Sequence, residues 1–330
     1  MNRYARQMVL PEIGAAGQQC LAKARALVIG AGGLGSPVLQ YLAGAGVGHL
    51  TIVDPDIVER SNLHRQPIYT EQALGQNKAE AARDVLANLN PDISTTAHVA
   101  ELDPDNIEAL AHGMDVVFDC ADSFAATYTA SDYCLENDIP LISASVLSAN
   151  GYVGGFCGDA PSVRAVFPDL PSNLATCATA GVMGPVVGMT GSLQAQMGMA
   201  YLLDLKPSPL GKLVTIDALK FRFGGFRFDN APEPKDGCYR FIAPSAITPD
   251  DFVVELREDD EAPSPITNNA RRIAINDFAD IRPQPHHDTP RFVLVCRSGL
   301  RAWRAADQLR SWWSGPIALV AARNSTGEFT

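Results

Sequence analysis

Four glycines within six residues are the part of this sequence best suited to chemistry. Gly30-Ala31-Gly32-Gly33-Leu34-Gly35 directly follows the apolar segment 26–29. Glycines let a strand turn sharply into a helix with no side chain between backbone and ligand, and the N–H groups at the start of such a helix bind anions. Asp54 comes nineteen residues after Gly35 and follows a second apolar segment, where it can accept a hydrogen bond from a ribose hydroxyl. The spacing therefore predicts a nucleotide-binding site.

Further charged and amide side chains lie close to this loop in the sequence. The segment Ser61-Asn62-Leu63-His64-Arg65-Gln66 follows the second apolar strand, and Lys78 begins the next expected helix. Together with Arg6, these cations could neutralise a triphosphate, and Asp122 could hold Mg²⁺ on it. Each charge taken singly could instead be a solvated surface group. We expect the set to converge at the carboxyl edge of a parallel sheet. The candidates are Arg6, Gly30, Gly32, Gly33, Gly35, Asp54, Asp56, Asn62, Arg65, Gln66, Lys78 and Asp122.

Apolar segments and helical segments alternate down to about residue 157, which predicts an α/β fold with a doubly wound, Rossmann-like, mostly parallel sheet. Residues 158–179 are polar and irregular, and we expect a loop there. A proline-rich region, 232–265, precedes a second, smaller α/β segment, so the expected domains are 1–243 and 244–330. The expected strands are 26–30, 50–54, 94–99, 115–120, 140–146 and 152–157, and the expected helices are 34–45, 76–89 and 124–136.

Composition narrows the class of protein. The chain has 330 residues, 46 % of them hydrophobic, and a formal net charge of −11, which argues against nucleic-acid binding. Seven cysteines without a CxxC pair, and no recognisable signal peptide, predict a reducing, cytoplasmic location. The uncharged stretch 178–203 is long enough for a membrane span, but Pro185 and several glycines interrupt it. We expect a tightly packed helix, or a broken helix pair, instead of a span.

Several motifs occur together in the order of one family. They are Arg3-Tyr4-x-Arg6-Gln7, the glycine run, Asp54-x-Asp56, Ser61-Asn62-Leu63-x-Arg65-Gln66, Gly75-Gln76-x-Lys78, Asp119-Cys120-x-Asp122, Thr176-Cys177-x-x-Ala180-Gly181-Val182-x-Gly184-Pro185 and Gly191-Ser192-Leu193-Gln194-Ala195. Over about residues 2–240 the chain thus resembles the ThiF/MoeB/HesA adenylyltransferases, relatives of the ubiquitin-activating enzymes. The resemblance implies that ATP adenylylates the C-terminal Gly-Gly carboxylate of a small ubiquitin-like sulfur carrier (ThiS- or MoaD-like) and releases pyrophosphate.

The resemblance also implies residue roles. Arg65 and Lys78 would hold phosphates, Asp54 would bind the ribose, and Asp122 would bind Mg²⁺ with ATP. Arg6 would reach in from the partner subunit of a homodimer, and Asn62 and Gln66 would support the phosphate region. The sequences of segments 179–182 and 184–188 resemble those of thiamine-pathway members more closely than those of molybdopterin-pathway members.

Cysteines add two further expectations. Cys177 resembles a loop nucleophile that bonds covalently to the carrier in thiamine-type members, although a buried, incidental thiol is the alternative. Most relatives hold structural zinc through two CxxC pairs, which here would fall at Ser162 with Ala165 and at Cys238 with Phe241. Serine, alanine and phenylalanine do not replace thiolate ligands, so we predict no structural zinc.

Near the C-terminus, Cys296-Arg297-Ser298-Gly299-Leu300-Arg301 lies between an expected strand, 292–295, and an expected helix, 302–313. The loop resembles the active-site loop of rhodanese-type sulfurtransferases, in which backbone N–H groups and arginines surround a thiolate that carries persulfide sulfur. Phosphatase loops need one more residue between cysteine and arginine. The segments 252–257 and 269–273 would supply strands of an abbreviated rhodanese-like domain. Degenerate packing without sulfur chemistry is the alternative.

Two further classes of function remain open from the sequence. An NAD-dependent oxidoreductase would explain the glycines and Asp54, but it leaves Arg6, Arg65 and Lys78 without a role. A non-catalytic scaffold that binds the carrier would explain the missing zinc ligands, but not the complete ATP-binding set.

Overall fold

A mixed eight-stranded sheet forms the core of the larger part of the chain. In the computed structural model, which describes residues 2–170, 181–234, 238–285 and 289–322, the strand order is β3-β2-β1-β4-β5-β6-β7-β8. The first five strands in that order are parallel, and β6, β7 and β8 are antiparallel. The strands are β1 (Arg25–Ile29), β2 (His49–Val53), β3 (Ser94–His98), β4 (Val116–Asp119), β5 (Leu141–Leu147), β6 (Asn150–Phe156), β7 (Lys212–Asp217) and β8 (Arg222–Arg227).

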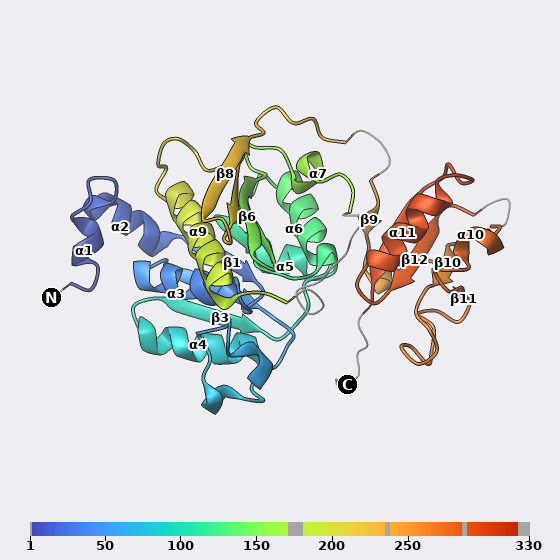
Figure 1. Ribbon diagram of the computed structural model, residues 1–330, viewed down its shortest axis with the longest axis horizontal. Helices are drawn as coiled ribbons and strands as arrows, with labels where there is room; N and C mark the ends of the chain where they lie inside the picture. Colours follow the sequence, from blue (N-terminus) through green and yellow to red (C-terminus); the bar gives the residue numbers. More distant parts are fainter. Residues whose placement is uncertain (1, 171–180, 235–237, 286–288, 323–330) are drawn as a thin grey trace. The chain divides into compact units, whose positions relative to one another are not determined.

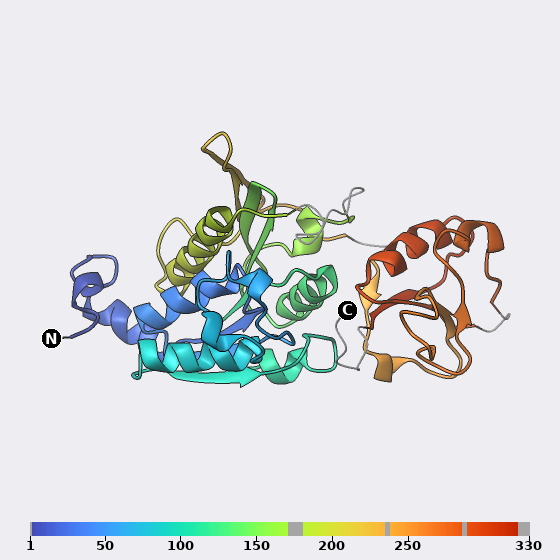
Figure 2. The same ribbon diagram turned by 60° about the horizontal axis from the view of Figure 1, so that its bottom comes forward.

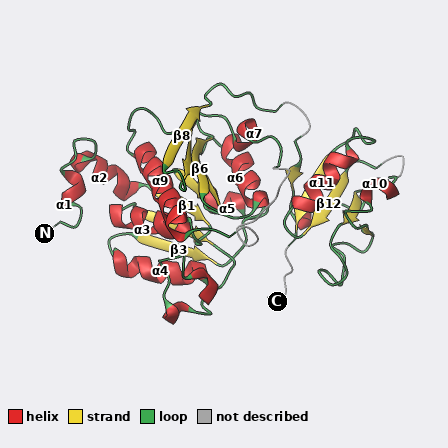
Figure 3. Cartoon of the chain, viewed as in Figure 1, coloured by secondary structure: helices red, strands yellow, loops and turns green. Residues whose placement is uncertain are grey.

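Helices connect most of these strands, except β5 to β6 and β7 to β8, and Figure 3 shows them in red beside the yellow strands. The strongly apolar β1, β2 and β4 are buried along most of their length, as parallel strands covered on both faces must be. The helices are α1 (Ala5–Met8), α2 (Gly14–Lys23), α3 (Gly35–Ala45), α4 (Lys78–Leu89), α5 (Ile107–Ala111), α6 (Phe124–Glu136), α7 (Val163–Val166) and α9 (Gly184–Leu202), with short 3₁₀ turns η1 (Arg60–Asn62) and η2 (Glu71–Ala73). The predicted doubly wound, Rossmann-like architecture is confirmed.

The register of the parallel strands brings three loops to one edge of the sheet. Ile29 at the end of β1 pairs with Val53 of β2 on one side and with Asp119 of β4 on the other. The N–H of Gly30 donates to the Val53 carbonyl at 2.8 Å, and the N–H of Cys120 donates to the Ile29 carbonyl at 2.9 Å. The chain therefore leaves all three strands at the same level, and the loops that follow them are neighbours.

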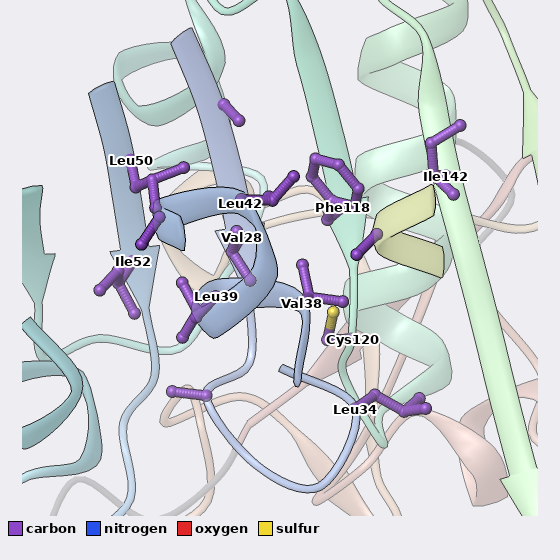
Figure 4. Close-up of a cluster of buried hydrophobic side chains, with 14 of the residues drawn as sticks. Val28, Leu34, Val38, Leu39, Leu42, Leu50, Ile52, Phe118, Cys120 and Ile142 are labelled. Carbon is purple, nitrogen blue, oxygen red and sulfur yellow. The ribbon is translucent and has the colours of Figure 1, made fainter. Parts of the chain in front are cut away.

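The uncharged stretch near residue 190 forms one continuous helix, α9, and not a broken pair. Glycines on α9 allow it to pack very closely: a Cβ at Gly198 would collide with the ring of Phe118, and one at Gly191 would lie 2.5 Å from Pro37. The close-up in Figure 4 shows Phe118 in the same cluster as Leu34, Leu39 and Ile52. None of the described helices is both long and apolar enough to cross a membrane.

A second compact unit includes most of the chain from Pro234 onward, together with the short segments Asp103–Asn106 and Ser123–Thr129; the first unit comprises Met1–Leu102, Ile107–Asp122 and Ala130–Glu233. The second unit contains a five-stranded parallel sheet of order β11-β10-β12-β13-β9. Its elements are β9 (Arg240–Phe241), η3 (Pro244–Ala246), β10 (Phe252–Glu255), β11 (Arg271–Arg272), α10 (Phe278–Ile281), β12 (Phe292–Cys296), α11 (Leu300–Leu309) and β13 (Ile317–Ala321). Figure 1 labels most of them, and Figure 2 shows the unit, in orange and red, from another side.

The antiparallel part of the large sheet is the main feature that the sequence did not predict. Residues 212–227 form the hairpin β7–β8, although β8 is exposed along its whole length and carries two glycines. Such a strand lacks the buried alternation that marks a strand in a sequence. Within the expected loop 158–179, the described residues contain the short helix α7.

Candidate functional site

The glycine loop between β1 and α3 has a shape that only glycine permits at several positions. Gly30 has φ +90°, and a Cβ there would lie 2.8 Å from the Cys120 carbonyl oxygen. A Cβ at Gly35 would collide with the Gly30 carbonyl, and one at Gly33 would lie 2.6 Å from the Val187 side chain on α9. The loop is therefore confined between β4, the first turn of α3 and the first turn of α9.

Backbone amides of this loop are available to a ligand. The N–H groups of Gly32 and Gly33 donate to no acceptor among the described residues, while the Gly32 carbonyl accepts the N–H of Ser36 as α3 begins. Unpaired amides at the N-terminus of an eleven-residue helix favour a phosphate, because both the N–H groups and the helix dipole attract negative charge.

Asp54, at the end of β2, is the buried carboxylate beside this loop, with only 4 % of its surface exposed. Its two oxygens accept the N–H groups of Ala31, at 2.7 Å, and Asp56, at 2.8 Å. Burial raises the pKa of the Asp54 carboxyl above its ordinary value, and the Lys78 ammonium opposes this shift. Asp54 thus joins the glycine loop to the loop that follows β2.

Lys78 is a buried cation at the first position of α4. Its side chain is 7 % exposed, and its Nζ lies 2.9 Å from Oδ2 of Asp56. A buried ammonium is strongly disfavoured without a partner, and Asp56 supplies one. The hydroxyl of Tyr69 contacts this region as well, at 3.0 Å from the Lys78 carbonyl.

The segment 61–66 places an arginine and a glutamine beside the glycine loop. Arg65 Nη1 donates to the Ser61 carbonyl at 3.0 Å. Gln66 is 2 % exposed, and its Nε2 lies 3.6 Å from where a Cβ of Gly32 would be. The Oε1 atom of Gln66 is buried without a hydrogen-bond partner, which is costly unless a ligand supplies a donor.

Asn62 stabilises the local backbone. Its Oδ1 accepts the N–H of Glu59 at 3.1 Å and so completes a capping box around η1. The start of α9 packs against this segment, because a Cβ at Gly184 would collide with the His64 carbonyl. These contacts hold the backbone that carries Arg65 and Gln66.

Asp122 lies three residues beyond β4, at the same sheet edge, and is exposed. Among the described residues, no group of three histidine, cysteine or carboxylate side chains could hold a metal ion alone. Mg²⁺ commonly binds one or two carboxylates together with substrate phosphates. A single exposed carboxylate therefore fits Mg²⁺ only when phosphates complete the coordination.

Arg6 lies at the opposite end of α3 from the glycine loop. Its helix, α1, is held there because Gln7 Nε2 donates to the Ala45 carbonyl at 2.8 Å and Gly46 packs on the Tyr4 ring. The eleven residues of α3 span about 16 Å, more than an arginine side chain can reach. The structure thus brings the other predicted ATP-site residues to one sheet edge and leaves Arg6 at the other.

Polar contacts surround Ser162 and Arg164, in the segment where the resemblance places the first expected CxxC pair. Oxygens of Glu233 accept the N–H and the hydroxyl of Ser162, both at 2.6 Å. Arg164, 5 % exposed, pairs with both oxygens of Asp132 at 2.6 and 2.9 Å. These bonds tie α7 to α6 and to the chain that follows β8. Cys177 lies outside the described residues.

Cys296 ends β12 in the second unit and is fully buried. Its Sγ accepts the N–H of Ala302, in the first turn of α11, at 3.4 Å. Arg301 is held by Glu261 through two contacts of 2.6 Å. These hydrogen bonds are the largest cause that raises the pKa of Arg301, ahead of its electrostatic interactions with Glu261 and Cys296. The loop thus has the thiol, a helix N-terminus and a nearby guanidinium.

Comparison with known proteins decides the family. The model of the ThiF family matches residues 4–239. The chain belongs to the ThiF family. It is 40 % identical over 240 residues to the molybdopterin-synthase adenylyltransferase of Salmonella typhimurium, covering 72 % of this chain and 95 % of that protein. It is 46 % identical over 209 residues to the adenylyltransferase and sulfurtransferase UBA4 of Yarrowia lipolytica, but covers only 51 % of that protein and 61 % of this chain.

A solved structure agrees in fold. The crystal structure of E. coli MccB with AMPCPP and MccA has a TM-score of 0.62 and 23 % identity, covering 70 % of this chain and 73 % of that one. Two buried residues that are not among the predicted site residues support the backbone of the site. Tyr69 bonds the glycine loop, and Gln194 donates to the carbonyls of Asp119 and Ile142 at 2.7 and 2.8 Å. Gln194 belongs to a family motif, whereas Tyr69 carries no sequence signal because a lone tyrosine usually packs in the core.

Proposed function

We propose that this ThiF-family chain uses ATP to adenylylate the C-terminal carboxylate of a small ubiquitin-like sulfur carrier. The observation that carries the proposal is the convergence of free glycine-loop amides, the buried Lys78 and the unpaired Gln66 oxygen at one sheet edge. An NAD-dependent oxidoreductase would not need a buried lysine and an arginine there. Family membership and this geometry together favour nucleotidyl transfer.

In the proposed reaction, a carboxylate oxygen of the carrier bonds to the α-phosphorus of ATP. The bond from that phosphorus to the bridging oxygen breaks, and pyrophosphate leaves. Because two anions must meet, the protein has to screen their repulsion and orient them. The amides of Gly32 and Gly33, with Lys78 and Arg65, would hold phosphates. Asp54 would accept a ribose hydroxyl in addition to its two backbone bonds, since a carboxylate has four lone-pair sites.

Two other parts of the site would act only in the complete assembly. Asp122 would hold Mg²⁺ jointly with the phosphates, where the ion neutralises developing charge. Arg6 cannot reach the site of its own chain, which supports the proposal that it serves the partner subunit of a homodimer. In a two-fold symmetric dimer, each chain would then supply one arginine to the other.

The proposed carrier is of the molybdopterin-synthase type. The match to the Salmonella typhimurium protein covers 95 % of that protein, which is named a molybdopterin-synthase adenylyltransferase. The sequence preference for the thiamine pathway remains a prediction without support from these relatives. The chain is also 35 % identical to the adenylyltransferase and sulfurtransferase MOCS3 of Xenopus laevis, and this match covers 89 % of the chain and so extends into the second unit. It supports the further proposal that the second unit transfers sulfur. A sulfane-sulfur donor such as thiosulfate would give its outer sulfur to Cys296, and sulfite would leave. The terminal sulfur of this persulfide would attack the acyl carbon of the adenylate, and AMP would leave. A second thiol would then attack Sγ of Cys296 in the acyl disulfide, form a disulfide with it and release the carrier thiocarboxylate.

The experiment uses the full chain with purified MoaD-like and ThiS-like carriers. Carrier-dependent exchange of pyrophosphate into ATP, with a mass increase of the carrier by one adenylyl group, is the expected result. A carrier that lacks its last glycine is the control and should give no exchange. Tight NAD binding without any exchange would refute the proposal, and ATP binding without turnover on every carrier would indicate a scaffold.

A further inference from the structure

Tyr69 bridges two elements of the proposed ATP site. It follows the segment 61–66 and is 5 % exposed. Its hydroxyl lies 2.8 Å from the carbonyl oxygen of Ala31 in the glycine loop and 3.0 Å from the carbonyl oxygen of Lys78 at the start of α4. A hydroxyl has one hydrogen, so the two carbonyls share it. One side chain thus spans the loop that offers amides and the helix that offers the ammonium.

The Ala31 residue is held from both ends. Its N–H donates to Asp54 Oδ2 at 2.7 Å, and its carbonyl accepts from Tyr69. Ala31 itself is fully buried, so water cannot replace either partner. The peptide planes on both sides of Ala31 are therefore fixed, and with them the direction of the Gly32 N–H that follows.

The environment of Tyr69 also keeps its hydroxyl a donor. Burial strongly raises the pKa of the phenol, and the negative charges of Asp54 and Asp56 raise it further. The hydroxyl therefore remains protonated at neutral pH.

We propose that Tyr69 is a positioning residue for ATP, which sets the separation between the glycine-loop amides and Lys78. This inference rests on the proposed function. Tyr69 does not touch the phosphates, since its hydroxyl faces two backbone carbonyls. Without the bridge, the loop and the first turn of α4 are still joined by Asp54, Asp56 and the Lys78 N–H, but the carbonyl of Ala31 loses its partner.

The test compares Tyr69→Phe with the wild-type chain. Phenylalanine keeps the ring in the core and removes only the bridge. We expect the dissociation constant for ATP, measured by calorimetry, and the KM for ATP in pyrophosphate exchange to rise about five- to tenfold, as for one lost buried hydrogen bond. The KM for the carrier and kcat should change less than about twofold. Tyr201→Phe makes the same chemical change on α9, outside the ATP site, and should leave all four quantities unchanged.

A second variant separates positioning from stability. Replacement of Tyr69 by p-aminophenylalanine keeps a donor at the same ring position and should restore ATP affinity. If Tyr69→Phe binds ATP as tightly as the wild type, or if the amino variant restores Tm but not ATP affinity, the assignment of Tyr69 is wrong. If instead the wild-type chain binds no ATP, the proposed function is wrong, and the role of Tyr69, which rests on it, is wrong as well.

Discussion

Replacing Lys78 by methionine is the most informative perturbation of the proposed site. Methionine has about the length of lysine and suits a side chain that is only 7 % exposed, but it carries no charge. The variant loses the 2.9 Å ion pair with Asp56 and the cation proposed to hold a phosphate. Packing of the first turn of α4 should persist, so the experiment isolates the charge.

Two magnitudes follow for Lys78→Met. The proposed bond from Lys78 to a phosphate is a hydrogen bond to a charged group, which contributes about 1.5–3 kcal/mol to binding. Its loss should therefore lower kcat/KM for ATP about 10- to 150-fold. Because the Asp56 side chain is 38 % exposed, the ion pair itself should contribute only about 1–2 kcal/mol to folding, or roughly 2–8 °C in Tm.

The stability loss should depend on pH. Burial already raises the folded-state pKa of Asp54, so Asp54 opposes folding increasingly as pH rises from its ordinary pKa through the raised one. Removing Lys78 raises this pKa further, because Lys78 is the charge that lowers it. The difference in unfolding free energy between wild type and variant should therefore grow as the pH rises above about 4, the ordinary aspartate pKa.

The assays are carrier-dependent pyrophosphate exchange and denaturant unfolding across this pH range. Lys206→Met is the matched control, because it also removes a lysine–aspartate pair, here with side chains 71 % and 87 % exposed. The control should keep its activity and lose less than about 0.5 kcal/mol. A Lys78→Met variant with kcat/KM within threefold of the wild type would refute the placement of Lys78 at the phosphates.

Three other substitutions test the remaining parts of the molecule. Asp122→Ala should abolish pyrophosphate exchange and leave the fold intact, because the residue is exposed; near-normal exchange would remove Asp122 from the mechanism. Glu233→Gln should lower the unfolding free energy of the first unit by about 1–2 kcal/mol in denaturant unfolding, because the single amide oxygen can accept only one of the two hydrogen bonds from Ser162. Metal analysis of the purified wild-type protein should find no stoichiometric zinc. Cys296→Ala should not react with a persulfide-selective probe after thiosulfate treatment, whereas the wild type should; equal labelling of both would exclude sulfur transfer by Cys296.

Much of the fold could be predicted because its signals are local. Buried parallel strands are continuous apolar runs, so β1, β2 and β4 were found within a residue or two of their ends. The hairpin β7–β8 escaped prediction because β8 is exposed and has no apolar pattern. At the site, the predicted residues Asp54, Gln66 and Lys78 meet beside the glycine loop, since the carboxyl ends of parallel strands share one edge.

By itself, the sequence determined the glycine turn, the order of strands and helices, and the residue types available at the carboxyl edge, because each depends on neighbours along the chain. Only the tertiary structure decided which of those residues meet. It pairs Lys78 with Asp56, bonds Tyr69 to the glycine loop, joins Glu233 to Ser162 and leaves Arg6 at the far end of α3. Those contacts join segments far apart in the chain, and the register of the sheet and the packing of its helices set them.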